Sequence, residues 1–174
     1  MPKLRDSKGR FVLQPPSKFK GGTVEAQNID KAVKSLKKDV DNVCFRTLKG
    51  MIAGGLILQR AAQQLTPVDT ANLKASATTI WATKRAEGKP AFKGPNAAAE
   101  GSRHAKIVKE EKAGMSKSVL SPEVDVLFTA SYGIYVHEDL EAKHKEGKQA
   151  KFLTAAAAAN SAAILSAVKQ EAKI

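Results

Sequence analysis

One long amphipathic pattern in the N-terminal half constrains the fold more than any other feature of the chain. Apolar residues recur between Asn28 and Leu65 at spacings of three and four, with lysines and aspartates between them. These spacings place the apolar side chains on one face of an α-helix. Asn28 can cap the first turn, and Pro67 cannot continue the helix. The apolar stripe comprises Ile29, Val33, Leu36, Val40 and Val43, followed by Leu48, Met51, Ile52 and Leu56, and the polar residue Gln59 continues the same face toward Leu65.

Glycines interrupt this pattern near its C-terminal end. A single helix over residues 28–65 would be about 57 Å long at 1.5 Å per residue. Gly50, Gly54 and Gly55 are expected either to bend it or to divide it in two. The spacing of Gly50 and Gly54 also permits close approach of a neighbouring element.

The remainder of the chain predicts strands followed by a last helix. Residues 77–84 hold three threonines with Ile80 and Trp81, which favour a strand. Residues 118–129 alternate like a half-buried strand, and residues 132–138 predict a short helix or turn. The alanine-rich segment 150–169 has high helix propensity. The order of elements indicates an α+β fold, with an antiparallel sheet of three to five strands and a C-terminal helix packed on it.

The positive charge is concentrated in two segments. The chain carries a net charge of +12, of which residues 1–22 and residues 84–117 each contribute +5. Prolines and glycines without periodicity predict an extended basic arm over residues 1–27, whose apolar residues Phe11, Val12, Leu13 and Phe19 favour docking on a partner. Glycine and proline likewise predict a long flexible loop over about 85–117. Residues 28–174 then form a single domain.

Residues suited to catalysis or to metal binding occur without the partners that such chemistry requires. The single cysteine, Cys44, excludes an intrachain disulfide framework and is expected to be a buried, inert thiol. His137 and His144 are seven residues apart, whereas zinc ligands usually pair at spacings of three to five on one element. Asp69 and Thr70 have no identifiable base partner, and capping explains both. We therefore expect a protein that is not an enzyme and has no cofactor, metal or small-molecule substrate.

Two apolar segments are candidates for membrane spans. Residues 51–58 are far shorter than the roughly 20 residues that a span needs. Residues 152–168 lack charge, but they are mostly alanine with interspersed Thr154, Asn160, Ser161 and Ser166. This composition predicts a packed helix and no membrane association.

Two motifs flank the predicted strands in the sequence, one before residues 77–84 and the other after residues 118–129. In Thr66-Pro67-Val68-Asp69-Thr70-Ala71-Asn72-Leu73, one helix ends and a short one begins, with Asp69 or Thr70 as its cap. In Ala130-Ser131-Tyr132-Gly133-Ile134-Tyr135-Val136-His137-Glu138, two tyrosines lie three residues apart beside a His-Glu pair. Such rings with polar tips suit a contact surface.

Taken with Gln149-Ala150-Lys151-Phe152-Leu153, these motifs resemble the head–tail joining, or tail-completion, proteins of tailed bacteriophages. The resemblance covers roughly residues 45–170. Ala71 stands where that family usually has glycine, and we expect Ala71 to be helical. The resemblance implies an α+β virion protein of the neck or tail top, made in the host cytoplasm. It also implies a set of motif and assembly-contact residues: Pro67, Asp69, Thr70, Asn72, Leu73, Tyr132, Tyr135, His137, Glu138 and Phe152.

The partners implied by the resemblance are further copies of the chain in a homo-oligomeric ring, together with neck, portal-side and tail proteins around the genomic DNA. The alternative is a small basic nucleic-acid-binding protein, since the isoelectric point is near 9.8. The chain lacks a recognisable nucleic-acid-reading motif, and Trp81, Tyr132 and Tyr135 form no stacking stripe. We expect the basic 84–117 segment to dock on protein, because residues outside the two basic segments are nearly neutral.

Overall fold

The computed structural model describes residues 22–67, 71–82, 85–86, 90–118 and 120–173. The chain divides into two compact units, Met1–Asp39 and Val40–Ile174, instead of at the expected boundary between residues 27 and 28. Helix α1, Gly22–Leu65, runs without interruption. Residues 22–27 therefore belong to a helix and not to an extended arm, and the glycines do not divide α1. Residues 1–21 of the predicted arm lie outside the described residues.

The described part of the first unit consists of the N-terminal turns of α1. Its apolar side chains Ile29, Val33 and Leu36 are 61, 57 and 63% exposed. The predicted helix is therefore confirmed here. Its apolar face, however, is left open to solvent within this unit.

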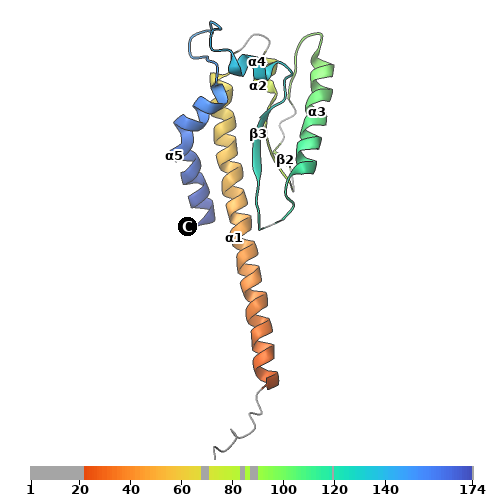
Figure 1. Cartoon of the computed structure of the whole chain (residues 1–174), viewed down its shortest axis with the longest axis vertical. Helices are drawn as coiled ribbons and strands as arrows, with labels where there is room; N and C mark the ends of the chain where they lie inside the picture. The colour runs from red at the N-terminus through yellow and green to blue at the C-terminus, as the bar shows by residue number, and fades with distance from the viewer. Residues whose placement is uncertain (1–21, 68–70, 83–84, 87–89, 119, 174) are drawn as a thin grey trace, which may run out of the picture. The chain divides into compact units, whose positions relative to one another are not determined.

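The second unit has the α+β architecture expected from the sequence (Figure 1). Its sheet is antiparallel, with β1 (Ala77–Trp81) in the centre between β2 (Arg85–Ala86) and β3 (Val124–Phe128). Thr79 of β1 pairs with Val126 of β3, and Trp81 pairs with Val124. The elements that follow α1 are α2 (Asn72–Ala75), β1 (Ala77–Trp81), β2 (Arg85–Ala86), α3 (Ala97–Gly114), β3 (Val124–Phe128), α4 (Gly133–Glu138) and α5 (Phe152–Ala172).

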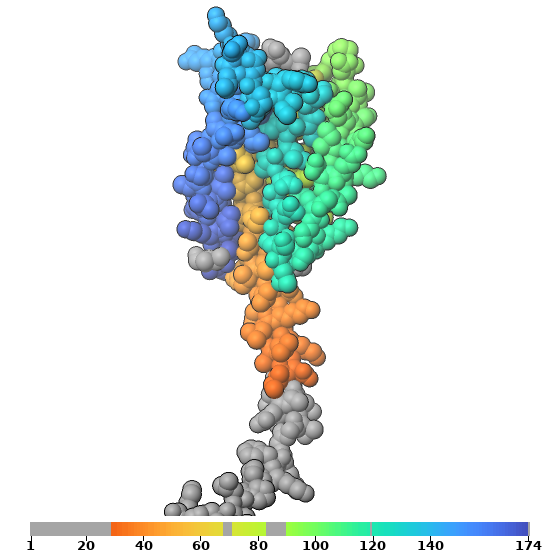
Figure 2. All heavy atoms as spheres, in the orientation of Figure 1, coloured from red at the N-terminus to blue at the C-terminus, as the bar shows by residue number. Residues whose placement is uncertain are grey.

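Glycines on α1 allow α5 to approach closely, as their spacing predicted. A β-carbon on Gly50 would lie 2.7 Å from the Val168 Cα, and one on Gly54 would lie 2.9 Å from Ile164 Cγ2. Gly55 faces the sheet, where a β-carbon would meet Thr79 at 2.9 Å. Within the second unit, α5, the C-terminal part of α1, the sheet and α3 thus lie side by side (Figures 1 and 2).

Hydrophobic residues form clusters on both faces of the sheet. On the α1 face, a cluster is formed by Ala62, Leu73, Ala130, Phe152 and Ala156. On the other face, Ile80 packs with Val108 and Met115. Gln59 joins α1 to β1, because its side-chain amide donates to the Ala77 carbonyl at 3.1 Å and accepts from the Thr79 hydroxyl at 2.7 Å. The sheet is thereby fixed between two layers of helices.

The expectation of a flexible loop over 85–117 is wrong for most of that segment, because residues 97–114 form α3. Of the glycines and prolines that indicated a loop, Pro90, Gly94 and Pro95 lie before the helix, whereas Gly101 lies within it. The helix itself is rich in alanine, lysine and glutamate, which have high helix propensity. Val108 is 7% exposed, so burial of one face adds to that propensity.

Candidate functional site

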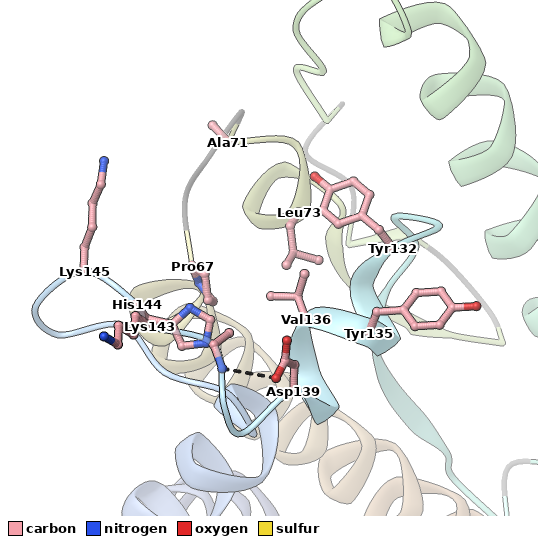
Figure 3. A pocket seen from close by; sticks show the side chains of 11 residues that line it. Pro67, Ala71, Leu73, Tyr132, Tyr135, Val136, Asp139, Lys143, His144 and Lys145 are labelled. Carbon is pink, nitrogen blue, oxygen red and sulfur yellow. Dashed lines mark hydrogen bonds between the residues drawn. The ribbon is translucent and has the colours of Figure 1, made fainter.

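The two motifs meet at one end of the second unit. Pro67 and Leu73 from the first motif and Tyr132 and Val136 from the second line a hollow of about 390 Å³. Ala71 and Tyr135 also line it, and residues 139–145 contribute the remaining wall, including Asp139 and His144 (Figure 3). The structure thus brings together side chains that are about 70 residues apart in the sequence. Asp69 and Thr70 lie outside the described residues, so their capping role stays a prediction.

Ala71 corrects one expectation. Its backbone is in the left-handed region, with φ 63°, and α2 begins at the next residue. A non-glycine residue in this conformation costs about 1–2 kcal/mol because its β-carbon crowds the backbone. The glycine typical of the resembled family would remove this crowding, so the helical interpretation of Ala71 is wrong.

Asn72 holds the chain segment that leads into α3. Its side-chain Nδ2 donates to the Lys93 carbonyl at 2.9 Å, and its Oδ1 accepts from the Lys93 backbone N–H at 2.8 Å. Asn72 itself is only 7% exposed, whereas Lys93 is exposed, so both hydrogen bonds are partly buried. Sequence reasoning identified Asn72 but missed Lys93, because nothing in the sequence indicates a backbone partner so far along the chain.

Leu73 and Phe152 are core residues. They are 3% and 1% exposed and belong to the same cluster. The Phe152 ring makes edge contacts with Phe128 at 5.0 Å and with His137 at 4.8 Å between centroids. Packing within the chain therefore accounts for the apolar side chains at these two motif positions.

His137, Glu138 and Lys151 form a polar group beside this core. His137 Nδ1 lies 2.8 Å from Glu138 Oε1, and Lys151 Nζ donates to Glu138 Oε2. These two hydrogen bonds, that of Lys151 first, lower the pKa of Glu138 below its ordinary value of 4.5. The Lys151 backbone N–H also donates to the His137 carbonyl at 2.7 Å. The group therefore ties α4 to the start of α5.

The outer surface of α4 is apolar and exposed. Ile134 and Tyr135 are 67 and 75% exposed, and Leu140 just beyond the helix is 74% exposed. Figure 3 shows the Tyr135 ring directed away from Pro67 and His144. Tyr132, by contrast, is half-buried and packs against the core. Of the two tyrosines, Tyr135 is the more exposed, and a partner contact of either one stays a prediction.

A second hollow, of about 500 Å³, was not foreseen from the sequence. It is apolar and lies between α1 and the end of the sheet, with Phe45, Leu48 and Trp81 among its walls. Cys44 is partly exposed at this hollow, so the expectation of a buried thiol is wrong. Phe45 is 61% exposed, and such an aromatic residue beside the stripe of α1 is the signal that could have indicated this surface.

The described residues provide contact surfaces joined by a hydrogen-bonded scaffold. Among them, no cluster of three or more His, Cys, Asp and Glu side chains is placed to hold a metal ion. One described helix, α5, is long and apolar enough to cross a membrane by length and composition. No family model, curated protein or solved structure matches this chain.

Proposed function

We propose that this protein is a bacteriophage virion structural protein of the neck or tail top. In this proposal it forms a homo-oligomeric ring that completes the tail and joins it to the head around the DNA path. The observation that supports the proposal is that both motifs and the start of α5 meet at one end of the second unit. Its outer surface presents Ile134, Tyr135 and Leu140, which suit packing against a neighbouring subunit.

The proposed mechanism is mechanical. The hydrogen bonds of Lys151 to the Glu138 carboxylate and to the His137 carbonyl tie the exposed α4 surface to the start of α5 and hold it in a fixed orientation. A preorganised surface loses less entropy when it binds a partner. The subunits would pack side by side, and the basic N-terminal segment would clasp an adjacent ring made of neck, portal-side or tail proteins.

Inactivating the gene tests this function. We expect filled heads and separate tails to accumulate, and added wild-type protein to restore joined particles. A double variant, Ile134→Ser with Tyr135→Ser, should fail to restore joining. Leu120→Ser is the matched control, because Leu120 is an apolar residue exposed by 66% outside the α4 surface. Joined, infectious particles formed without the protein would contradict the proposal.

The nucleic-acid-binding alternative has a separate test. Most of the excess charge of residues 84–117 lies before α3, while α3 itself holds four basic and three acidic residues. Contacts with phosphates would make duplex affinity fall steeply with salt concentration. We expect weak binding of free duplex at physiological salt. Tight binding there, with a steep salt dependence, would instead favour the alternative.

A further inference from the structure

Helix α5 has an apolar outer face that the subunit does not cover. Its inner face packs on α1 through Ile164 and Val168. Its most apolar stretch has a mean hydropathy of 1.3, yet only 11% of that stretch is buried. The exposed outer positions include Leu165, which is 59% exposed, and a series of small residues: Ala158, Ala159, Ala162 and Ser166. An exposed apolar face of this kind marks a contact surface.

Helix α1 presents a complementary face. Ile29, Val33, Leu36, Val40 and Val43 repeat at spacings of four, three, four and three and are between 41 and 63% exposed. This spacing is the heptad signature of a helix that packs along another helix. We call these five residues the α1 stripe.

The two faces are complementary in side-chain size. The α1 stripe consists of large branched side chains, whereas the outer face of α5 is built mainly from alanine and serine. A shallow hollow between Ala162, Leu165 and Ser166 could receive such a side chain. The same kind of fit already operates within the subunit, where the Ile164 side chain of α5 packs over Gly54. Residues 152–168 of α5 also carry no charge that packing would bury.

We propose that the α1 stripe of one copy packs on the outer face of α5 of a second copy. The contact joins two different surfaces. The first copy therefore keeps the outer face of its α5 free for a further neighbour, and the second copy keeps its α1 stripe free. Such head-to-tail contacts close into rings when the rotation allows it. This inference adds a second contact between copies to that of the α4 surface, and it rests on the proposed function only for the closure of the ring.

This arrangement covers both apolar faces at once, and the competing arrangements do not. Pairing of the α1 stripe with a second α1 stripe would leave α5 exposed. Insertion of α5 into a membrane would leave the α1 stripe exposed and would draw the ion pair between Lys49 and Glu171 toward lipid. Charged side chains in the hydrocarbon region are costly.

Disulfide cross-linking between two differently labelled copies tests the contact. In a Cys44→Ser background, one full-length copy carries Leu36→Cys and the other carries Ala162→Cys. We expect a heterodimer only when both copies are mixed and oxidised. Lys38→Cys is the matched control for Leu36→Cys, because Lys38 is exposed on the opposite side of the same helix. A Leu36→Cys homodimer as the main product, or cross-linking no stronger than in the control, would overturn the proposal.

A charge exchange provides a second test that does not depend on oxidation. Leu36→Glu should reduce the oligomer mass in solution without a change in helix content, since Leu36 is 63% exposed in the subunit. Adding Ala162→Arg to the same chain should restore the oligomer. An oligomer unaffected by Leu36→Glu would contradict this interface. The phage function would still stand if the wild-type protein rejoined heads and tails, so the two failures are distinguishable.

Discussion

Gly50 of α1 lies against the backbone of Val168 in α5, so closely that a β-carbon on Gly50 would fall 2.7 Å from the Val168 Cα. A flexible side chain could move aside, but here the nearest atoms belong to helix backbone. The separation of the two helices is therefore set by the absence of a side chain at residue 50. This contact fixes the orientation in which α5 presents its outer face.

Gly50→Ala should destabilise the second unit. Alanine gains up to about 1 kcal/mol of helix propensity over glycine, but overpacking typically costs about 1–3 kcal/mol. Because backbone has to move, we expect a net loss in the free energy of unfolding measured with urea. Gly101→Ala in α3 is the matched control, since its nearest neighbour, Phe92, would be 3.9 Å away. That control should be neutral or stabilising; a stabilised Gly50→Ala would show that the helices are not in close contact.

Ala71→Gly should stabilise the protein. It relieves a left-handed alanine that costs about 1–2 kcal/mol. Glycine also makes the unfolded chain more flexible, which reduces the gain in the free energy of unfolding by about 0.4–1 kcal/mol. We expect a net gain of roughly 0.5–1 kcal/mol in thermal or urea unfolding. Ala75→Gly, within α2, should instead destabilise. If both glycines destabilise equally, Ala71 is helical after all.

Asn72→Ala should be more harmful than an equivalent change on the surface. It removes two partly buried hydrogen bonds to the Lys93 backbone, and a typical hydrogen bond contributes about 0.5–1.5 kcal/mol to stability. Asn160→Ala is the control, because Asn160 makes one local hydrogen bond to the Ala156 carbonyl in α5. Equal effects of the two changes on the free energy of unfolding would argue against a clamp at Asn72.

Glu138 should make stability depend on pH in the acidic range. Its pKa is lowered by hydrogen bonds from Lys151 and then His137, so the carboxylate is favoured in the folded state. This stabilisation is complete above the ordinary pKa of 4.5 and is lost as the pH falls through the lowered value. Glu138→Gln should therefore lower the melting temperature at pH 7 and have little effect at low pH.

Asp125→Asn is the control for Glu138→Gln, because we expect it to change the melting temperature at pH 7 in the opposite direction. Burial, followed by the nearby carboxylates of Glu123 and Glu111, raises the pKa of Asp125 above the ordinary value of 3.8. Its charge thus opposes folding above the raised pKa, and Asp125→Asn should raise the melting temperature at pH 7. At low pH this gain should disappear. Two variants that shift stability in the same direction at pH 7 would refute this assignment of charges.

The sequence predicted the elements whose signal is local. The stripe of α1 and the alanine-rich run of α5 specify helices by period and propensity, and both are confirmed. Alternation around Val126 predicted β3. In these segments each residue's own preference agrees with its place in the fold.

The errors arose where local signals conflict with tertiary contacts. Gly94 and Pro95 indicated a loop, but they lie just before α3. Burial of Val108 stabilises this helix. Ala71 has a high helix propensity, yet the chain around it requires a left-handed turn. The Asn72 clamp on Lys93 depends on two segments meeting in space, and one sequence carries no signal for that contact.

Cryo-electron microscopy of particles purified from cells that carry this gene tests the central claim most directly. The account predicts a closed ring of this chain at the neck or tail top, around the DNA path. In that ring, α4 should lie at a subunit or ring contact. Particles whose neck and tail top lack the chain, or in which it is present as isolated monomers, would contradict the account.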